Sequence, residues 1–573
     1  ALIGLTLAGL QIVNQWPNGY EATLSIPIGN TINGWEIMLK FAGPVSLQAW
    51  LGDVQSNVGD QTYVLRNKDY NGNLASGSTY EFKFVVDFKG VSGNLIQATI
   101  NGQNIDLGEN IPVNPGTTAA TTPAGSTQGP INPTLPNGNY DYGAVLRASL
   151  LFYEAQRAGK LPANNRIPWR SDSMLMDRGE NGEDLTGGYF DAGDYVKFNF
   201  PMAGTTTLLA WGVLDYEDAY ATAGELVNAR EALKWATDYF IKCHVSKREF
   251  YGQVGDGNDD HASWSRPEDW TKNRPAWKLT NDKPGSDLLA ETAAALAATA
   301  MVFRTADKAY SDTLIHHARE LYDFANDRRG KYSDSIPNAS SFYNSWSGYG
   351  DELAWGAAWL YRATSDPRYR FEVDSHWNEF SLGGQPQEFG WDDKKAGVQI
   401  LMARVTGEQK FKQAAESFCN YIVRNAPKSP KGLVFLSQWG ALRHAGNVAF
   451  VCLQAAAAGI NTQEYVNFAA KQINYILGDS GRSYVIGFGN DYPKKPHHRS
   501  SSCPNRPALC DWNAYNSPNP NPQLLVGALV GGPDQQDFYE DKRDDYIKNE
   551  VATDYNAGFT SAVAGLAHYA NKV

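Results

Sequence analysis

The chain has 573 residues, more than one ordinary domain core holds, so we expect two domains or one very large one. Its formal net charge of −12 argues against a nucleic acid or an anionic membrane as a partner, because both require a basic surface. Aromatic residues make up 12% of the chain, and flat rings of this kind stack on the apolar faces of sugars. The composition therefore favours a neutral polymer as the partner.

Five cysteines are present, an odd count, and none of them shows the CxxC spacing of a zinc site. Cys243, Cys419 and Cys452 lie in apolar helical runs, where we expect buried thiols. Cys503 and Cys510 flank a proline-containing loop, and this spacing allows a short disulfide without requiring one. No apolar run approaches the roughly twenty residues that a membrane helix needs, so we expect a soluble protein.

Apolar and polar residues alternate over residues 11–107, as in TYEFKFVVDF, between turns rich in Gly, Asn and Asp. This period of two predicts an antiparallel β-sandwich, which we assign to a first domain at residues 1–108. The apolar start of the chain, ALIGLTLAGL, fits a remnant of a signal peptide or a first strand equally well.

Three aromatic residues of this domain, Trp16, Trp50 and Tyr70, lie beside turn residues, where a core ring is not expected. Trp35, in NGWEIMLKF, fits the core instead. The stretches NQWPNGYEATLSI and INGWEIMLKF resemble the first two strands of the bacterial-type family 2 cellulose-binding modules. The resemblance implies that Trp16, Trp50 and Tyr70 form the flat platform that lies on crystalline cellulose.

Residues 109–138 are dominated by Pro, Thr, Gly and Ala, which predicts a semi-extended linker. Over residues 139–573 the period becomes helical. Some runs, such as DLLAETAAALAATAMVF, are apolar all round and must be enclosed by other helices, and the similar helix ends VFRTADK, LYRATSD and MARVTGE indicate repeated hairpins. We therefore predict a multidomain protein in which an all-α (α/α) barrel follows the β-sandwich in the sequence. Six helical hairpins would fit the length of this second domain.

Two carboxylate clusters lie at opposite ends of the helical region. Asp191 and Asp194, in DAGDYVKF, are three residues apart around a small turn, so both carboxylates can face one water molecule. The closeness of two like charges would raise the pKa of one aspartate while the other stays ionised. Glu550, in YEDKRDDYIKNEVATDYNAGF, lies where a predicted helix ends. Each cluster alone also fits a plain structural role, an Asx turn or N-cap for the aspartates and a solvated helix end for the glutamate. Together they predict acid and base catalysis.

The loop GQVGDGNDDHASWSRPEDW is too long and aromatic to be a mere connection. His261 and Trp264 in this loop suit a sugar clamp, in which a ring stacks and an imidazole forms a hydrogen bond. Asp259, Asp260 and His261 leave a metal site open as the alternative.

Trp391 and Trp439 each precede a predicted helix, which would put substrate-binding rings at the mouth of a ring-shaped cavity. His497, His498 and Arg499 form a loop that we expect to be cationic, either a solvated patch or a group that binds sugar hydroxyls.

The segment SWSGYGDELAW holds several oxygen donors, Ser347, Gly348, Asp351 and Glu352. This set fits a hard cation such as calcium or, on spacing alone, a capped helix start.

Taken together these segments resemble glycoside hydrolase family 9, the inverting cellulases with an (α/α)6 barrel. YEDKRDDYIKNEVATDYNAGF resembles the C-terminal signature of the family, DAGD its base motif, and SYVIGFG followed by PHHR its histidine motif. The resemblance implies that Asp194 is the general base, Asp191 orients the attacking water and Glu550 is the general acid. It further implies glucose-binding residues at His261, Trp264, Trp439, His497, Arg499 and Tyr555, and a structural calcium held by Ser347, Gly348, Asp351, Glu352 and Asp393.

The expected protein is thus a secreted, monomeric endo-β-1,4-glucanase that cuts internal bonds of cellulose and soluble β-1,4-glucans with inversion, without an organic cofactor. This chemistry needs acid and base roughly 6.5 to 9.5 Å apart. It also needs a protonated Glu550, so we expect burial or a carboxylate such as Asp541 to raise its pKa while Asp194 stays charged. One rival is a non-catalytic cellulose-binding protein, which the intact acid and base residues disfavour. The other is a terpene-cyclase-like enzyme using magnesium and diphosphate, which lacks a basic pocket here.

Overall fold

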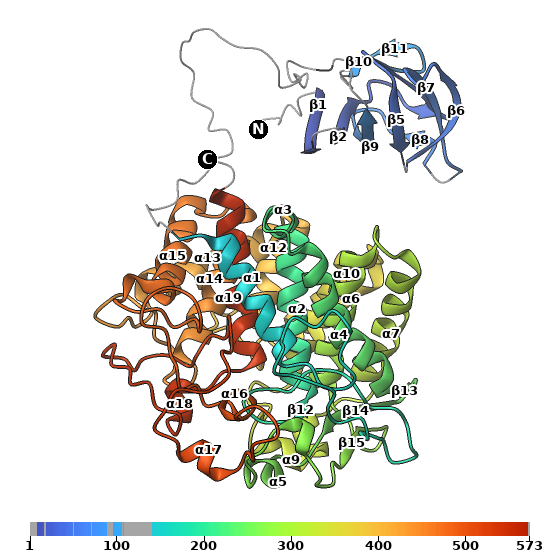
Figure 1. Ribbon diagram of the computed structural model, residues 1–573. Helices are drawn as coiled ribbons and strands as arrows, with labels where there is room; N and C mark the ends of the chain where they lie inside the picture. The colour runs from blue at the N-terminus through green and yellow to red at the C-terminus, as the bar shows by residue number, and fades with distance from the viewer. Residues whose placement is uncertain are drawn as a thin grey trace. The chain divides into compact units, whose positions relative to one another are not determined.

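The computed structural model describes residues 9–16, 19–49, 51–69, 71–88, 95–105, 107 and 140–570. The chain forms two compact units, residues 1–127 and 128–573, which are drawn together in Figure 1. The predicted linker at residues 109–138 lies outside the described residues, so its boundaries stay predictions.

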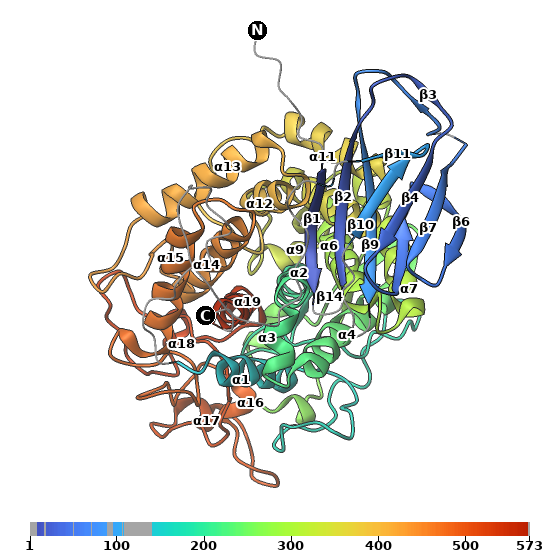
Figure 2. The same ribbon diagram turned by 90° about the horizontal axis from the view of Figure 1, so that it is seen from above.

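The first unit is an antiparallel β-sandwich, as the alternating pattern predicts (Figure 2). Its two sheets enclose a core of inward-facing apolar side chains in which Trp35 is only 1% exposed, which confirms that this ring belongs to the core. One sheet has the order β1 (Gly9–Trp16), β2 (Gly19–Pro27), β9 (Thr79–Phe88) and β5 (Val45–Ala49). The other has the order β11 (Gln103–Asn104), β10 (Leu95–Ile100), β4 (Glu36–Phe41), β7 (Thr62–Asn67) and β6 (Gly52–Val58), and β3 (Ile32–Asn33) pairs with β8 (Asn73–Leu74).

The predicted cellulose platform is not covered by the structure. Trp16 ends β1, but its side chain lies outside the described residues, as do Trp50 and Tyr70 entirely. The platform therefore stays a prediction.

The second unit is a closed double ring of helices, so the predicted (α/α)6 barrel is confirmed (Figure 2). In the inner ring each helix packs against the next and the last packs against the first. Small residues allow this close approach; a Cβ added at Gly212, for example, would lie 2.4 Å from Ser561 Oγ on the neighbouring helix. The inner helices are α2 (Asn199–Asp215), α6 (Ser286–Phe303), α10 (Gly350–Thr364), α12 (Lys395–Thr406), α14 (Ala441–Ala457) and α19 (Thr553–Ala570).

The outer ring consists of helices that each bury one face against an inner helix, as amphipathic helices do. These are α1 (Tyr142–Ala155), α4 (Leu226–Cys243), α7 (Lys308–Asp327), α11 (Pro367–Glu379), α13 (Gln409–Asn420) and α15 (Thr462–Asn474).

Short elements occupy the connections, and many of them gather at the lower end of the barrel in Figure 1. The strands are β12 (Lys197–Phe198), β13 (His244–Ser246), β14 (Glu249–Val254) and β15 (Ala276–Leu279). The helical turns are α3 (Glu217–Thr222), α5 (Gly257–His261), η1 (Pro267–Asp269), α8 (Tyr332–Ser335), α9 (Pro337–Ser340), η2 (Tyr421–Asn425), η3 (Tyr475–Asp479), α16 (Arg499–Ser502), α17 (Trp512–Asn516) and α18 (Tyr546–Asn549).

One helix, α6, is long and apolar enough to cross a membrane by length and composition, contrary to the expectation that no such run exists. All of its residues except Met301 are buried among the surrounding helices. Its apolar character is therefore explained by its central place in the barrel.

The cysteines correct one prediction and settle another. Cys419 on α13 and Cys452 on α14 form a disulfide with a Cα–Cα distance of 5.8 Å, so they are not the free thiols we expected. The pairing of an outer with an inner helix brings them together. Cys503 and Cys510 also form a disulfide, with a Cα–Cα distance of 5.2 Å. Among the described cysteines only Cys243 is a buried free thiol.

Candidate active site

A cavity of about 670 Å³ lies among the loops of the barrel. The structure brings every predicted catalytic and substrate-binding residue to this one cavity, although they come from loops spread over most of the second unit. The lining residues include Asp191, Asp194, His261, Trp264, Trp391, Trp439, His497, Arg499, Glu550 and Tyr555.

The DAGD loop is held tightly against the histidine motif. The amide of Arg499 donates to the carbonyl of Gly193 at 3.2 Å. A Cβ added at Gly193 would lie 2.3 Å from the backbone oxygen of His497, so only glycine fits this contact. Gly193, which lies between the two aspartates and contacts the histidine loop, therefore has to be a residue without a side chain.

Backbone hydrogen bonds join the loop of the aspartates to the segment of Glu550. The amide of Thr553 donates to the carbonyl of Asp191 at 2.8 Å, and the amide of His497 donates to the carbonyl of Asn549 at 2.8 Å. Glu550 itself lies between α18 and α19, and its carbonyl accepts from the amide of Gly531 at 2.9 Å. The closure of the helix ring therefore places the two distant carboxylate clusters side by side.

The two aspartates each have one oxygen that is bound and one that is free. Asp191 Oδ2 accepts from the Tyr343 hydroxyl at 2.5 Å, and Asp194 Oδ1 accepts from the amide of Ala192 at 3.1 Å. The other oxygens, Asp191 Oδ1 and Asp194 Oδ2, are buried and have no hydrogen-bond partner within the described residues. Buried polar atoms are normally paired, so these two oxygens are suited to hold a water molecule between them.

The surroundings of the two aspartates differ in charge. Burial raises the pKa of Asp191 well above its usual value, and the charge of Asp194 raises it further. Burial also raises the pKa of Asp194, with a contribution from Asp260, but His261 and Arg499 act in the opposite direction. The Arg499 guanidinium thus favours the ionised form of Asp194, which is the form a general base needs.

The pKa of Glu550 is also raised, but no cation is among the main groups that act on it. Burial raises the pKa of Glu550 to about 7; the carboxylates of Asp194 and Asp554 add to this rise, and the hydrogen bond from Trp439 opposes it. Asp541, which we expected to contribute, is not among the main groups that raise this pKa. Its oxygens accept from the amides of Lys494 and Lys495 at 2.8 and 2.9 Å. A carboxyl with a pKa of about 7 is about half protonated at pH 7 and mostly protonated below it.

The histidine loop is less cationic than predicted. Burial lowers the pKa of His497 to about 4 and that of His498 to about 3, so both rings are neutral near pH 7. His497 Nδ1 donates to the carbonyl of Arg543 at 2.7 Å, which leaves Nε2 as an acceptor towards the cavity. His498 is structural: its Nε2 donates at 2.8 Å to Gln156, whose amide supports the DAGD loop at the Ala192 carbonyl. Of His497, His498 and Arg499, only the arginine is therefore a cation.

The alternative of a metal site at His261 has a geometric basis. Ligand atoms of Asp194, Asp260 and His261 all lie within 4.8 Å of one another. Asp260, however, forms an ion pair with Arg499 at 2.5 Å. This guanidinium already supplies the positive charge that a cation would bring, so the cluster is better suited to hydrogen bonding with a neutral ligand.

The predicted calcium ligands cluster around the start of α10 and the loop before α12. Ser347 Oγ lies 3.4 Å from Asp351 Oδ1, and burial raises the pKa of Asp393 to about 7 with a further contribution from Asp351. Both carboxylate oxygens of Glu352 are buried without a hydrogen-bond partner among the described residues, although Lys394 Nζ lies 3.8 Å away. Unpaired hard oxygen donors of this kind fit calcium. Within the described residues these carboxylates do not, however, meet as closely as those around His261.

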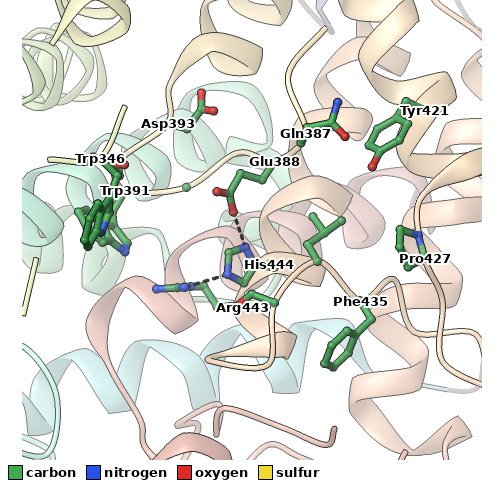
Figure 3. A pocket seen from close by; sticks show the side chains of 14 residues that line it. Trp346, Gln387, Glu388, Trp391, Asp393, Tyr421, Pro427, Phe435, Arg443 and His444 are labelled. Atoms are coloured by element: carbon green, nitrogen blue, oxygen red, sulfur yellow. Dashed lines mark hydrogen bonds and ion pairs between the residues drawn. The ribbon is translucent and has the colours of Figure 1, made fainter. Parts of the chain in front are cut away.

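A second pocket of about 530 Å³ adjoins the cavity that holds Asp194 and Glu550 (Figure 3). The two share Trp346, Trp391 and Arg443 as lining residues, so they lie side by side. Figure 3 shows the rings of Trp346 and Trp391 at one side of this pocket and those of Tyr421 and Phe435 at the other. Rings at both ends provide stacking surfaces along the cleft.

Several lining residues were missed by the sequence analysis, although some belong to quoted motifs. Tyr343 lies just before the predicted calcium segment SWSGYGDELAW, and Trp346 lies within it. Arg443 lies four residues after Trp439, near the start of a predicted helix, where an arginine usually points to solvent. Here Arg443 forms an ion pair with Asp554 at 3.0 Å. Its place in the first turn of α14, four residues after the predicted Trp439, is the signal that would have found it. The missed residues of the two pockets include Phe342, Tyr343, Trp346, Tyr421, Phe435, Arg443, Trp512, Tyr515 and Tyr546.

Comparison with known proteins gives consistent matches for both units. The family model "Glycosyl hydrolase family 9" matches residues 142–563, and "Cellulose binding domain" matches residues 7–105. Endoglucanase A of Bacillus pumilus is 46% identical over 448 residues, which are 74% of this chain and 66% of that protein. Endoglucanase 15 of Arabidopsis thaliana is 44% identical over 470 residues, 75% of this chain and 94% of the relative. The solved structure of an endoglucanase from the termite Nasutitermes takasagoensis is 58% identical with a TM-score of 0.75, covering 75% of this chain and 99% of its own.

Proposed function

Because this chain belongs to glycosyl hydrolase family 9, we propose that it is an endoglucanase that hydrolyses internal β-1,4-glucosidic bonds of cellulose and soluble β-1,4-glucans. The observation that carries the proposal is the difference between Glu550, whose pKa is raised to about 7, and Asp194, which has Arg499 and His261 beside it. One cavity thus holds a carboxyl suited to donate a proton and, beside Arg499, a second carboxyl that we propose as the base.

The proposed reaction is hydrolysis with inversion. Asp194 takes a proton from a water molecule that the free oxygens of Asp191 and Asp194 hold, and this water attacks the anomeric carbon. Glu550 gives its proton to the glycosidic oxygen as that bond breaks. Trp439 Nε1 and the Tyr555 hydroxyl donate to Glu550 Oε2 at 3.2 and 3.3 Å, which leaves Oε1 to carry the proton.

Binding along the cleft supports cleavage within a chain. The shared walls at Trp346, Trp391 and Arg443 continue the catalytic cavity into the pocket of Figure 3, so several glucose units have rings to stack on. Neutral sugars need hydrogen bonds rather than ion pairs, and His261, His497 and Arg499 line the cavity to provide them.

Three further roles belong to this proposal. Trp16, Trp50 and Tyr70 are proposed to bind crystalline cellulose, in line with the match of this region to the cellulose binding domain. The loops around Asp351 and Asp393 are proposed to hold a structural calcium through Ser347, Gly348, Asp351, Glu352 and Asp393, where the ion would join the start of α10 to the loop before α12. Two disulfides support secretion, because disulfides persist in oxidising compartments.

Two variants test the catalytic proposal. Glu550→Gln and Asp194→Asn keep side-chain size and remove the proton donor and the base, so each is expected to lower hydrolysis of a soluble β-glucan by a factor of about 10² or more. Adsorption to cellulose should not change. A wild-type protein that adsorbs to cellulose but releases no reducing sugar would instead identify a non-catalytic binding protein.

The platform is tested separately. Replacing Trp16, Trp50 and Tyr70 together by Ala is expected to weaken adsorption to crystalline cellulose while turnover of the soluble β-glucan stays at the wild-type level. Unchanged adsorption would contradict the platform.

A further inference from the structure

Trp512 and Tyr515 lie on α17, which forms part of the wall of the catalytic cavity. This helix has only five residues, and so short a helix does not hold its shape by itself because nucleation is unfavourable. Its first turn is capped by Asp511, whose Oδ1 accepts from the amide of Asn513 at 2.9 Å. Contacts from outside the helix must therefore determine where the two rings lie.

The first such contact is the loop closed by the Cys503–Cys510 disulfide. Cys510 precedes Trp512 by two residues, and the buried disulfide packs in one apolar cluster with Trp264 and Tyr515. Trp264 is anchored on the other side of this cluster, since its Nε1 donates to Ser502 Oγ at 3.0 Å. The disulfide thus fixes the chain just before α17.

The second contact is the guanidinium of Arg543. Its Nη1 donates to the carbonyls of Ala514, Tyr515 and Ser517 at 3.1, 2.9 and 2.7 Å, at the C-terminal end of α17. Arg543 is buried, so these three hydrogen bonds are shielded from water. Helix α17 is therefore held at both ends.

The rings that this arrangement presents form a small aromatic surface. The Tyr515 ring lies 4.8 Å from that of Trp264 and 5.3 Å from that of Trp512, centroid to centroid. Trp512 nevertheless stays 44% exposed. Both residues line the catalytic cavity but not the adjoining pocket of Figure 3, so they belong to a different part of the cleft.

We infer that Trp512 and Tyr515 bind a glucose unit of the β-1,4-glucan chain by stacking, and that the Cys503–Cys510 disulfide is the brace that positions them. An exposed indole beside the catalytic cavity is the kind of surface that the apolar face of a sugar covers. The disulfide acts through the rings, so it is a positioning element and not a catalytic one. The inference rests on the proposed function, because the ligand is the proposed substrate.

The test compares three variants on cellohexaose, measuring KM and kcat. Trp512→Ala is expected to raise KM about two- to tenfold, the effect of losing one aromatic stacking contact, and to change kcat less. The double variant Cys503→Ala/Cys510→Ala should raise KM in the same direction, and adding Trp512→Ala to it should have little further effect. The matched control, Cys419→Ala/Cys452→Ala, removes a disulfide between α13 and α14 and should keep the wild-type KM.

An unchanged KM in Trp512→Ala would overturn the binding surface. If Cys503→Ala/Cys510→Ala behaves like the control disulfide variant, the brace is overturned. Calorimetric titration of cellohexaose into proteins carrying Glu550→Gln measures the same affinities without turnover. A wild-type protein that binds but does not cleave cellohexaose would contradict the proposed function, while the titration would still decide the inference.

Discussion

At the scale of single residues, the two donors around Glu550 both reach the same oxygen. Trp439 Nε1 and the Tyr555 hydroxyl donate to Oε2, so the geometry selects Oε1 as the site of the transferable proton. Burial raises the pKa of this carboxyl to about 7, and the buried carboxylates of Asp194 and Asp554 add to the rise. This raised pKa would let the carboxyl keep its proton up to about neutral pH, as the proposed acid requires.

This pKa predicts the alkaline limb of the pH profile. An acid catalyst works only while protonated, so kcat/KM on a soluble β-glucan should be retained below about pH 7 and lost as the pH rises through about 7. Thermal melts over the same range show whether unfolding contributes. Activity that stays constant far into alkaline pH would be inconsistent with Glu550 as the acid.

Tyr343 should matter because its hydroxyl is the only hydrogen-bond donor to the Asp191 carboxylate among the described residues. A hydrogen bond to a charged group is worth about 1.5–3 kcal/mol, so Tyr343→Phe is expected to lower kcat by roughly ten- to a hundredfold. Tyr546→Phe is a matched control in the same cavity, because no hydrogen bond of its hydroxyl is seen within the described residues. Equal effects of the two variants would speak against an orienting role for Asp191.

At the scale of elements, the contact between the DAGD loop and the histidine loop has no room for a side chain. Gly193→Ala would bring a Cβ to 2.3 Å from the His497 carbonyl, so we expect a loss of roughly 1–3 kcal/mol in the free energy of unfolding together with a loss of activity. Gly29→Ala, where nothing lies within 4 Å of the added atom, is the neutral control. Melting temperatures that fall equally for both would refute the close contact.

The loops at α10 and α12 make a prediction about calcium. If Asp351 and Asp393 hold the ion, a chelator should lower the melting temperature, and added calcium should restore it, because an ion bound only by the folded state stabilises it. Asp351→Asn should remove most of the effect of chelator and calcium on the melting temperature. We do not expect Asp351 to take a direct part in turnover. A melting temperature that changes with neither chelator nor added calcium would contradict the proposed calcium site.

Local patterns predicted the elements better than the contacts between them. Runs such as that of α6 show their burial directly in the sequence, and the two carboxylate clusters are recognisable as motifs. The Cys419–Cys452 pair was missed because it depends on how α13 packs on α14, which no spacing reveals. Asp541 is near Glu550 along the chain, yet it is not among the main groups that raise the pKa of Glu550. Nearness along the chain does not show which groups surround a carboxyl in the fold.

At the scale of the whole molecule, the closed ring of helices creates the site. The loop of Asp191 and Asp194 precedes α2 and Glu550 precedes α19, and these two helices pack against each other where the ring closes. The hydrogen bond from the Thr553 amide to the Asp191 carbonyl, at 2.8 Å, joins the first and last parts of the barrel sequence at the site itself. The stability of the ring and the placement of the proposed acid and base are therefore linked.

The central claim is that Asp194 and Glu550 act on opposite faces of the same glycosidic bond. Proton NMR of the reducing end formed during the first minutes of hydrolysis tests it most directly, because attack by a water molecule from the base side inverts the anomeric centre. We predict that the α-anomer appears first from a β-linked cello-oligosaccharide and then equilibrates. Initial release of the β-anomer would mean retention and would contradict the account.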